Sequence, residues 1–398
     1  MRGGERVLEE LCRLFPDAPV HVFFHEPGAV SETIERHRIR TSPLDALPGA
    51  RRIHRWTLPL LPLAAERMRV EPCDVLISTS HCVARAVRAP RGAPHLSICF
   101  TPMRYVWGMQ EAYVGRGARR ALFQLAAAPL RAWDRGTQRR VTRFVAISEY
   151  VRARIQRAYG RDADVVYPPV DVARFRPVET TDDYFLAVSA LVPYKRIDLL
   201  LDAFRGRPEE LWIAGGGPLL GSLRRAAPRN VRLLGWVEEA ELPGIVARAR
   251  ALLFPTEDEF GITAVEAQAA GRPVIALGRG GAAETVVPLG SSAAPTGLWF
   301  LEQTAAAIQA ALDRFREVES LFDPHAIRAH AERFAPERFR ERILSIVRDV
   351  LRSRAEPIDV ALSARPGNAT QGGRGPDGVG AVATSGATSR STSTRPPE

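Results

Sequence analysis

Asp258 and Glu266 lie eight positions apart in the segment 252–286, LLFPTEDEFGITAVEAQAAGRPVIALGRGGAAETV. Carboxylates accept hydrogen bonds, so these two side chains suit a ligand that carries many hydroxyl groups, such as a sugar or a ribose. Glu257 and Glu259 flank Asp258 and make the loop strongly acidic. The alternative is an ordinary solvated acidic loop, which is the more frequent case for one isolated segment of this kind.

The elements that must position these acids can be predicted from the same segment. The apolar run Leu252–Phe254 indicates a buried strand, and the residues 262–270 are good helix formers. Gly271 suits the left-handed residue just past a helix end. A second buried strand, Pro273–Leu277, follows directly, and the turn 278–281 leads into another helix. The segment therefore alternates strands and helices, with polar loops between them.

A helix that begins just after Gly261 would present free backbone N–H groups and the positive end of its dipole. We expect phosphate oxygens to bind the amides of Phe260, Gly261 and Ile262. Gly280 and Gly281 in the following turn would let the backbone approach a bound sugar closely.

Lys195 is the single lysine of a chain that has 55 basic residues. It follows the predicted strand Tyr184–Ser189, and Arg196 comes next. Cations at this place could neutralise the charge that grows on a departing phosphate. The alternative is a solvated surface pair, but a lysine in a chain that otherwise uses arginine favours a specific role.

These motifs resemble the donor site of family-four glycosyltransferases. D-E-F-G-I-T-A-V-E, A-Q-A-A-G-R-P-V-I-A and G-G-A-A-E-T-V are similar to the mannosyltransferase-like branch that serves polysaccharide and glycolipid assembly. The resemblance covers residue 2 to about residue 351, and it is strongest in 186–204 and 252–286. The family pattern is Glu, seven residues, Glu, whereas this chain has Asp258 first, so that its carboxylate reaches about one bond less far.

The resemblance implies an α/β protein of the GT-B fold, with two Rossmann-like domains facing each other across a cleft. It implies retaining, metal-independent transfer of a hexose from a nucleotide sugar to a saccharide or lipid-linked acceptor, with no cofactor. GDP-mannose is the favoured donor, and UDP donors stay open. No residue resembles a classical nucleophile, in keeping with a leaving phosphate that itself helps to deprotonate the acceptor.

The resemblance also assigns roles to individual residues. Lys195 and Arg196 would bind the diphosphate, Asp258 the sugar hydroxyls and Glu266 the ribose. The donor-binding residues would be Gly3, Gly4, Gly216, Phe260, Gly261, Ile262, Gly280, Gly281 and Glu284. The acceptor-side residues would be His81, Arg104 and Tyr105, for which a structural histidine and plain packing are the alternatives.

Two departures from the family pattern keep other functions open. Phe100 stands where many members have a histidine that meets the donor sugar, and Ala190 stands where an upstream arginine is common. A phenylalanine offers no hydrogen bond, and an alanine offers no charge. A catalytically weakened GT-B-like partner protein and a sugar-nucleotide epimerase are therefore alternatives.

The beginning of the sequence resembles the family's glycine-rich loop. Gly3-Gly4-Glu5 would be a loop that closes over the donor diphosphate, followed by an amphipathic helix over residues 6–15. In the family this loop follows the first strand, and no strand precedes it here. Losing a central strand would leave backbone groups of its neighbours unpaired. We therefore expect a missing first strand and a true start upstream of Met1.

The length of 398 residues favours two domains. We expect an N-terminal, acceptor-side domain over 1–170 and a nucleotide-sugar-binding domain over 171–335. A helix over 336–354 would cross back to the first domain, and 355–398, rich in Gly, Ser, Thr, Pro and Ala, would be a disordered tail.

The net charge is +10. A basic surface could serve nucleic acid, an anionic membrane or an anionic substrate, but no nucleic-acid-binding motif is visible. The basic amphipathic segment 115–143 could lie on an anionic membrane surface, with a solvated helix face as the alternative. The four cysteines form no CxxC pair, and no apolar run is long enough to span a membrane. We expect a cytoplasmic protein, with peripheral attachment to the inner membrane face as an open possibility.

Overall fold

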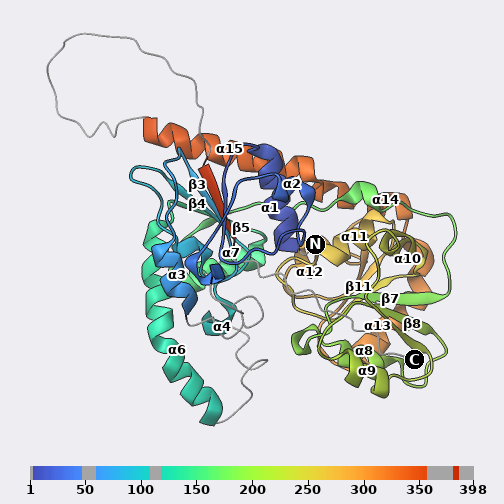
Figure 1. Cartoon of the computed structure of the whole chain (residues 1–398). Coiled ribbons are helices and arrows are strands. Elements are labelled where there is room, and N and C mark those ends of the chain that lie inside the picture. The colour runs from blue at the N-terminus through green and yellow to red at the C-terminus, as the bar shows by residue number, and fades with distance from the viewer. Residues whose placement is uncertain (1–2, 47–59, 108–117, 356–379, 385–398) are drawn as a thin grey trace, which may run out of the picture.

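The computed structural model describes residues 3–46, 60–107, 118–355 and 380–384, which form two α/β domains built on parallel sheets (Figure 1). The strand order is β2-β1-β13-β3-β4-β5-β6 in the first sheet and β12-β11-β10-β7-β8-β9 in the second. The predicted fold class, two Rossmann-like domains, is confirmed.

The first sheet is built from short strands, most of which are buried. Besides β13, which is described below, its strands are β1 Val20–Val22, β2 Ile39–Thr41, β3 Leu76–Ser80, β4 His95–Cys99, β5 Arg143–Ala146 and β6 Ala163–Val165. Every residue of β3 and β4 is buried, as expected for parallel strands that are covered on both faces.

The second sheet carries the predicted lysine and acid loops at the carboxyl ends of its strands. Its strands are β7 Tyr184–Val188, β8 Glu210–Ala214, β9 Val231–Gly235, β10 Leu252–Phe254, β11 Val274–Leu277 and β12 Gly297–Phe300. All neighbours pair in parallel, so the loops that follow the strands meet at one edge of the sheet.

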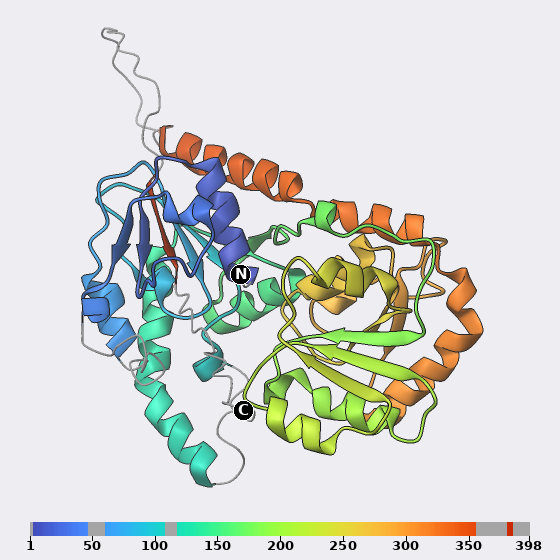
Figure 2. The ribbon, with the colours of Figure 1, turned by 45° about the vertical axis from the view of Figure 1, so that its right-hand side comes forward.

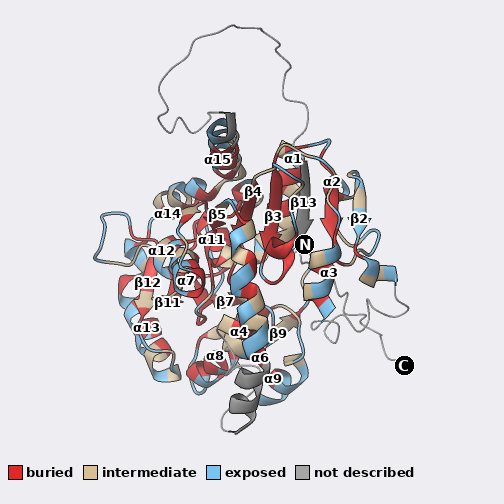
Figure 3. Cartoon of the chain, turned by 90° about the vertical axis from the view of Figure 1, so that its left-hand side faces the viewer, coloured by how far each residue is buried: buried red, intermediate tan, exposed pale blue. Residues whose placement is uncertain are grey.

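Helices cover the sheets, with exposed residues on their outer sides and buried strands beneath them (Figure 3). The helices are α1 Gly3–Leu14, α2 Glu32–Glu35, α3 Leu61–Arg67, α4 Arg104–Trp107, α6 Ala118–Thr137, α7 Glu149–Tyr159, α8 Ile197–Phe204, α9 Leu220–Ala226, α10 Leu242–Arg248, α11 Ile262–Ala269, α12 Ala282–Thr285, α13 Ala305–Val318, α14 Pro324–Ala331 and α15 Pro336–Ala355. Helices α14 and α15 are separate, because Ala335 precedes a proline and takes an extended ψ of 151°.

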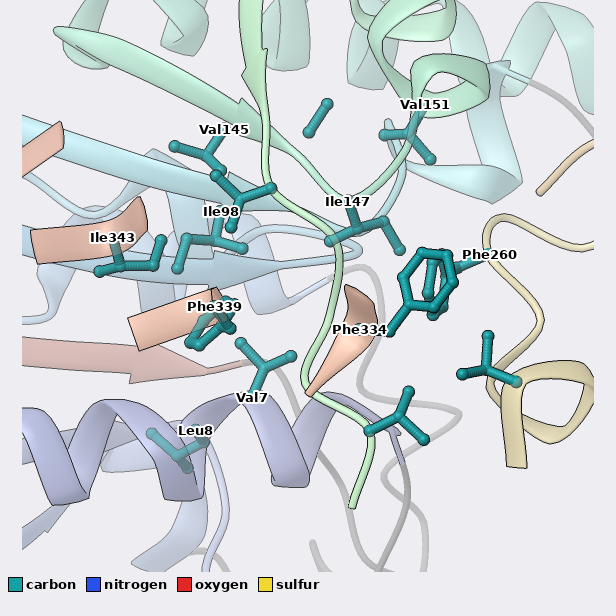
Figure 4. Packing of buried hydrophobic residues seen from close by; sticks show 14 of the residues in the cluster. Val7, Leu8, Ile98, Val145, Ile147, Val151, Phe260, Phe334, Phe339 and Ile343 are labelled. Atoms are coloured by element: carbon teal, nitrogen blue, oxygen red, sulfur yellow. The ribbon is translucent and has the colours of Figure 1, made fainter. Parts of the chain in front are cut away.

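Helix α15 lies along the first domain beside α1 (Figure 2). Its Phe339 and Ile343 join the same buried cluster as Val7 and Leu8 of α1 (Figure 4). The Arg340 guanidinium also forms an ion pair of 2.7 Å with Glu10 of α1. The chain therefore returns from the second domain to cover the first.

The C-terminal segment contributes a strand that the sequence did not predict. Strand β13, Gly380–Thr384, lies between β1 and β3, with Val382 opposite Val20 on one side and Ile77 on the other. The predicted disorder of 355–398 is wrong for these five residues. Without a strand here, backbone groups of β1 and β3 would be unpaired, and a short run of small residues is enough to pair with them. The position expected for a missing first strand is therefore occupied by the end of the chain.

We expect Val382→Pro to destabilise the first domain, because proline cannot donate a backbone hydrogen bond within a central strand. The unfolding temperature measured by calorimetry should fall by several degrees. Val382→Thr keeps the backbone amide and a β-branched side chain, so it is the control and should unfold close to the unaltered protein. An unfolding temperature of Val382→Pro equal to that of the unaltered protein would contradict the placement of β13.

Candidate functional site

Lys195 and Asp258 meet at the carboxyl edge of the second sheet. Lys195 ends the 3₁₀ turn Pro193–Lys195 after β7, and Asp258 lies in the loop between β10 and α11. Strands β7 and β10 are neighbours, which brings the two loops together. The distance from Lys195 Nζ to Asp258 Oδ2 is 2.6 Å, and the side chains are 14% and 22% exposed. The sequence predicted both residues, and the structure places them in contact.

Lys195 and Asp258 stabilise each other's charged form, which offsets the cost of burying the two charges. Burial lowers the pKa of Lys195, but Asp258 together with Tyr194 and Glu259 raises it by more, so that the net shift of this pKa is upward. Burial raises the pKa of Asp258, but Lys195 together with Arg104 and Glu259 lowers it by more, so that the net shift of this pKa is downward. Both groups are consequently charged at neutral pH.

Gly280 and Gly281 hold the acidic loop in place. A Cβ atom on Gly281 would lie 2.2 Å from the Cα of Phe260, and one on Gly280 would lie 2.5 Å from the Asp258 carbonyl oxygen. The Gly281 amide donates a hydrogen bond of 2.8 Å to that same carbonyl. The missing side chains allow close approach by the protein's own loop, and the predicted close approach by a sugar stays a prediction.

Helix α11 begins at the centre of this edge. Gly261 precedes it with a left-handed φ of 87°, and hydrogen bonding back to Gly261 O starts with the Ala264 amide at 3.0 Å. The Phe260 side chain turns away from the edge and packs on Tyr167 and Phe334, with ring centroids 5.7 and 5.5 Å apart (Figure 4). Phe260 can therefore offer only its backbone to a ligand, as predicted for the residues 260–262.

Helix α1 of the first domain meets the start of α11. A Cβ atom on Gly3 would lie 2.5 Å from Ile262 Cδ1, and one on Gly4 would lie 3.1 Å from the Phe100 ring. The loop predicted over Gly3–Glu5 is wrong, because these residues form the first turn of α1. Glu5 in that turn faces the positive end of the helix dipole, which favours helix there. The predicted contact of both glycines with a donor stays a prediction.

Arg6 of α1 forms an ion pair with Glu266 of α11. The distance between Arg6 Nη1 and Glu266 Oε1 is 2.6 Å, and the two side chains are 15% and 5% exposed. Burial raises the pKa of Glu266, although Arg6 acts to lower it. The sequence predicted Glu266 but not Arg6, because no local pattern links residues so far apart in the chain.

Glu284, predicted as a donor residue, is bound to the first domain. Its carboxylate accepts hydrogen bonds from the backbone amides of Glu149 at 2.8 Å and Tyr150 at 2.7 Å. These are free amides of the first turn of α7, so Glu284 stabilises that helix N-terminus from the other domain. A donor role for Glu284 stays a prediction.

Glu259 is the centre of a second ion-pair cluster across the domains. Arg104 Nη2 of α4 lies 2.5 Å from its carboxylate, and Arg154 Nη1 of α7 lies 3.3 Å from it. The Ser148 hydroxyl donates a hydrogen bond of 2.6 Å to the Glu259 carbonyl. Arg104 was predicted on the acceptor side, and the structure brings it to the same loop as Asp258. Sequence reasoning assigned no role to Glu259.

Some of the remaining predicted residues lie near the contact between the two domains, and others lie away from it. Arg196 has a left-handed φ of 52°, pairs with Asp198 at 3.0 Å and directly precedes α8. The Gly216 carbonyl accepts a hydrogen bond of 2.9 Å from the Leu191 amide in the lysine loop. His81 is exposed just after β3, and the side chain of Tyr105 lies outside the described residues.

Two further predictions concern larger features. Among the residues that the structure describes, no group of three or more His, Cys, Asp or Glu side chains is placed to hold a metal ion. No described helix combines the length and the apolar character needed to cross a membrane. The basic segment 115–143 is described only in part. Residues 115–117 are not described, and for residues 118–126 the structure describes the backbone but not the side chains.

Comparison with known families accounts for this arrangement. The family described as Glycosyltransferase Family 4 matches residues 1–174, and the family described as Glycosyl transferases group 1 matches residues 171–334. The chain belongs to the family-four glycosyltransferases. The two matches divide the chain between the first sheet and the second, as the structure does.

Relatives and solved structures agree with this membership. A GDP-mannose-dependent alpha-(1-6)-phosphatidylinositol monomannoside mannosyltransferase of Mycobacterium tuberculosis is 36% identical over 198 residues, 42% of this chain and 50% of the relative. A GDP-mannose-dependent monoacylated alpha-(1-6)-phosphatidylinositol monomannoside mannosyltransferase of Corynebacterium glutamicum is 33% identical over 174 residues, 36% of this chain and 46% of the relative. The chain thus spans about half the length of the curated relatives it matches.

A structural neighbour shows the same fold. Sucrose-phosphate synthase from Thermosynechococcus elongatus superimposes with a TM-score of 0.66 at 18% identity, covering 87% of this chain and 92% of the other. This family-four chain therefore has the GT-B fold.

We expect the pH dependence of nucleotide binding to report on Glu266. Its pKa is raised, so the ionised carboxylate, which the sequence predicts to accept ribose hydrogen bonds, is lost as the pH falls through that raised value, and affinity should fall with it. Arg6→Gln removes the group that lowers this pKa, so the loss of affinity should begin at higher pH. Glu266→Gln should remove this pH dependence.

Calorimetric titration of GDP from about pH 4 to pH 8 measures these shifts. Arg13→Gln changes an exposed arginine of the same helix and is the matched control. If GDP affinity falls at the same pH for the unaltered protein and for Arg6→Gln, Glu266 is not the group that causes the fall.

Proposed function

We propose that this protein is a retaining glycosyltransferase that moves a hexose, mannose from GDP-mannose in the first instance, to a saccharide or lipid-linked acceptor. The Lys195–Asp258 pair carries the proposal. It places a buried cation and a hydroxyl-binding carboxylate side by side, next to the start of α11. Few ligands need a cation, a carboxylate and free helix amides together, and a nucleotide sugar needs all three.

In the proposed reaction the residues offset negative charge on the diphosphate and hold the sugar and the ribose in position. The amides at the start of α11 and the Lys195 ammonium bind the diphosphate, and Lys195 offsets the negative charge that grows on the β-phosphate as the glycosidic bond breaks. Asp258 then accepts hydrogen bonds from sugar hydroxyls, and Glu266 from the ribose. The leaving phosphate oxygen accepts the proton of the acceptor hydroxyl on the same face of the sugar, which gives retention. Lysine and helix amides supply the positive charge, so the proposal includes no metal.

The names of the relatives support the choice of donor and acceptor. Both reported mannosyltransferases are described as GDP-mannose-dependent and as acting on a phosphatidylinositol mannoside. A lipid-linked acceptor also suits a peripheral position on an anionic membrane surface, for which the net charge of +10 is favourable.

A panel of donors tests the proposal directly. GDP-mannose, UDP-glucose and UDP-N-acetylglucosamine are titrated against the protein by calorimetry, and release of free sugar is followed in the same samples. We expect GDP-mannose to bind most tightly and to be hydrolysed slowly in the absence of an acceptor. Binding of none of the three donors would reject the proposal, and preference for a UDP sugar would reject the choice of mannose.

We expect Lys195→Ala to lower the rate of sugar release or transfer by about 10²–10³-fold, since one preorganised charge on the leaving group is lost. Arg205→Ala, which removes an exposed arginine of the same domain, should leave the rate unchanged. Turnover of Lys195→Ala at the unaltered rate would rule out the role given to Lys195.

A further inference from the structure

Arg104 has a buried hydrogen-bond donor that no described residue satisfies. Its Nη2 atom pairs with Glu259 at 2.5 Å, but its Nε atom is buried without a hydrogen-bond partner among the described residues. A guanidinium carries N–H groups on both of its edges, so one carboxylate cannot satisfy them all. An unsatisfied buried donor on a charged group is costly, and it indicates an acceptor that binds there.

The charges around Arg104 do not balance. Three cations, Lys195, Arg104 and Arg154, share the two carboxylates of Asp258 and Glu259. Side-chain exposure in this cluster ranges from 9% for Glu259 to 25% for Arg104. A partly buried cluster with one surplus positive charge is suited to an anionic ligand.

Tyr194 shows where that anion would lie. The Arg104 guanidinium carbon lies 5.7 Å from the centroid of the Tyr194 ring, and the Lys195 ammonium lies 5.4 Å from the same centroid. One cation belongs to α4 of the first domain and the other to the lysine loop of the second. Two cations from opposite domains therefore converge on one ring.

We propose that Arg104 binds the diphosphate of the nucleotide from the first domain, opposite Lys195. The inference rests on the proposed function and names one more residue for the same site. Glu259 occupies the Nη2 end of the guanidinium, and the Nε edge is free to donate to a phosphate oxygen. Arginine suits this position because its planar fork matches phosphate geometry while it keeps its contact with the carboxylate.

This contact would make diphosphate binding depend on both domains. Lys195 and the start of α11 belong to the second domain alone, so without Arg104 that domain would hold the phosphates by itself. With Arg104, the full set of cations exists only when α4 lies against the acidic loop. Glu259 then acts as the positioning residue, because it fixes the guanidinium beside Tyr194.

The test compares ligands that differ in one phosphate. GDP, GMP and inorganic pyrophosphate are titrated by calorimetry against the unaltered protein, Arg104→Gln, Arg104→Lys and Glu259→Gln, and UDP and UMP are run in parallel. We expect Arg104→Gln to weaken GDP and pyrophosphate binding by about 10–100-fold, the effect of losing a hydrogen bond to a charged group. GMP binding should change by less than about threefold, and Arg104→Lys should recover part of the GDP affinity.

Two controls show whether the variants are correctly folded: their unfolding temperatures and a double variant. Arg104→Gln leaves Glu259 paired with Arg154, and the double variant Arg104→Gln with Glu259→Gln leaves no unpaired carboxylate. The double variant should bind GDP as weakly as Arg104→Gln. An equal loss of GDP and GMP affinity, or no loss of either, would overturn the inference while leaving the proposed function intact. Failure of the unaltered protein to bind any nucleoside diphosphate would overturn both.

An anionic acceptor is the other ligand that could use Arg104. In that case Arg104→Gln would bind GDP and pyrophosphate normally, and the change would appear only in transfer to an anionic acceptor. That result also overturns the diphosphate assignment.

Discussion

A buried carboxylate must have a partner, and in this protein three acids of the second domain find their partners in the first. Glu266 pairs with Arg6, Glu259 pairs with Arg104 and Arg154, and the Glu284 carboxylate accepts amide hydrogen bonds at the start of α7. Removing one member of such a pair costs about 3–5 kcal/mol, whereas the net contribution of the intact pair is small. The pairs therefore specify how the domains face each other more than they stabilise the chain.

The loops of the site depend on each other in a second way, through the backbone. A Cβ atom on Gly215 would lie 1.9 Å from Ser189 O, and one on Gly217 would lie 2.5 Å from Leu191 O. The glycine turn after β8 is thus built directly on the loop that leads to Lys195, as the turn 278–281 is built on the loop of Asp258. Side chains at these positions would push the lysine and the aspartate apart. The pair that carries the proposed chemistry therefore requires glycine in both neighbouring turns.

The elements and site residues that could be predicted are those that a local sequence pattern defines. The strand β10 has the predicted bounds, because an apolar run defines it without help from distant residues. Lys195, Asp258 and Glu266 were found from residue type, position after a strand and resemblance. Arg6 was missed because its partner lies 260 residues away. Glu259 looked like one acid of a solvated run, and only the fold brings two arginines to it.

Predictions also failed where the fold offered a partner that no local rule includes. Gly3 and Gly4 were expected in a loop because they resemble the family's glycine-rich loop, but they form the first turn of α1, where contacts with Ile262 and Phe100 leave little room for a side chain. The segment of β13 has small residues and poor strand character, yet it pairs with two strands that are already in place. In both cases tertiary contacts outweigh intrinsic propensity.

The position of β13 also determines the order in which the protein can fold during synthesis. The second sheet uses one continuous stretch of chain, residues 184–300, and can form as soon as that stretch has left the ribosome. The first sheet leaves the ribosome earlier but stays open at its centre until residues 380–384 appear, on the order of tens of seconds after β6. During that time β1 and β3 expose facing edges that a neighbouring nascent chain could pair with. The domain that is made first is therefore completed last, and it is the one that most needs protection by chaperones in a crowded cell.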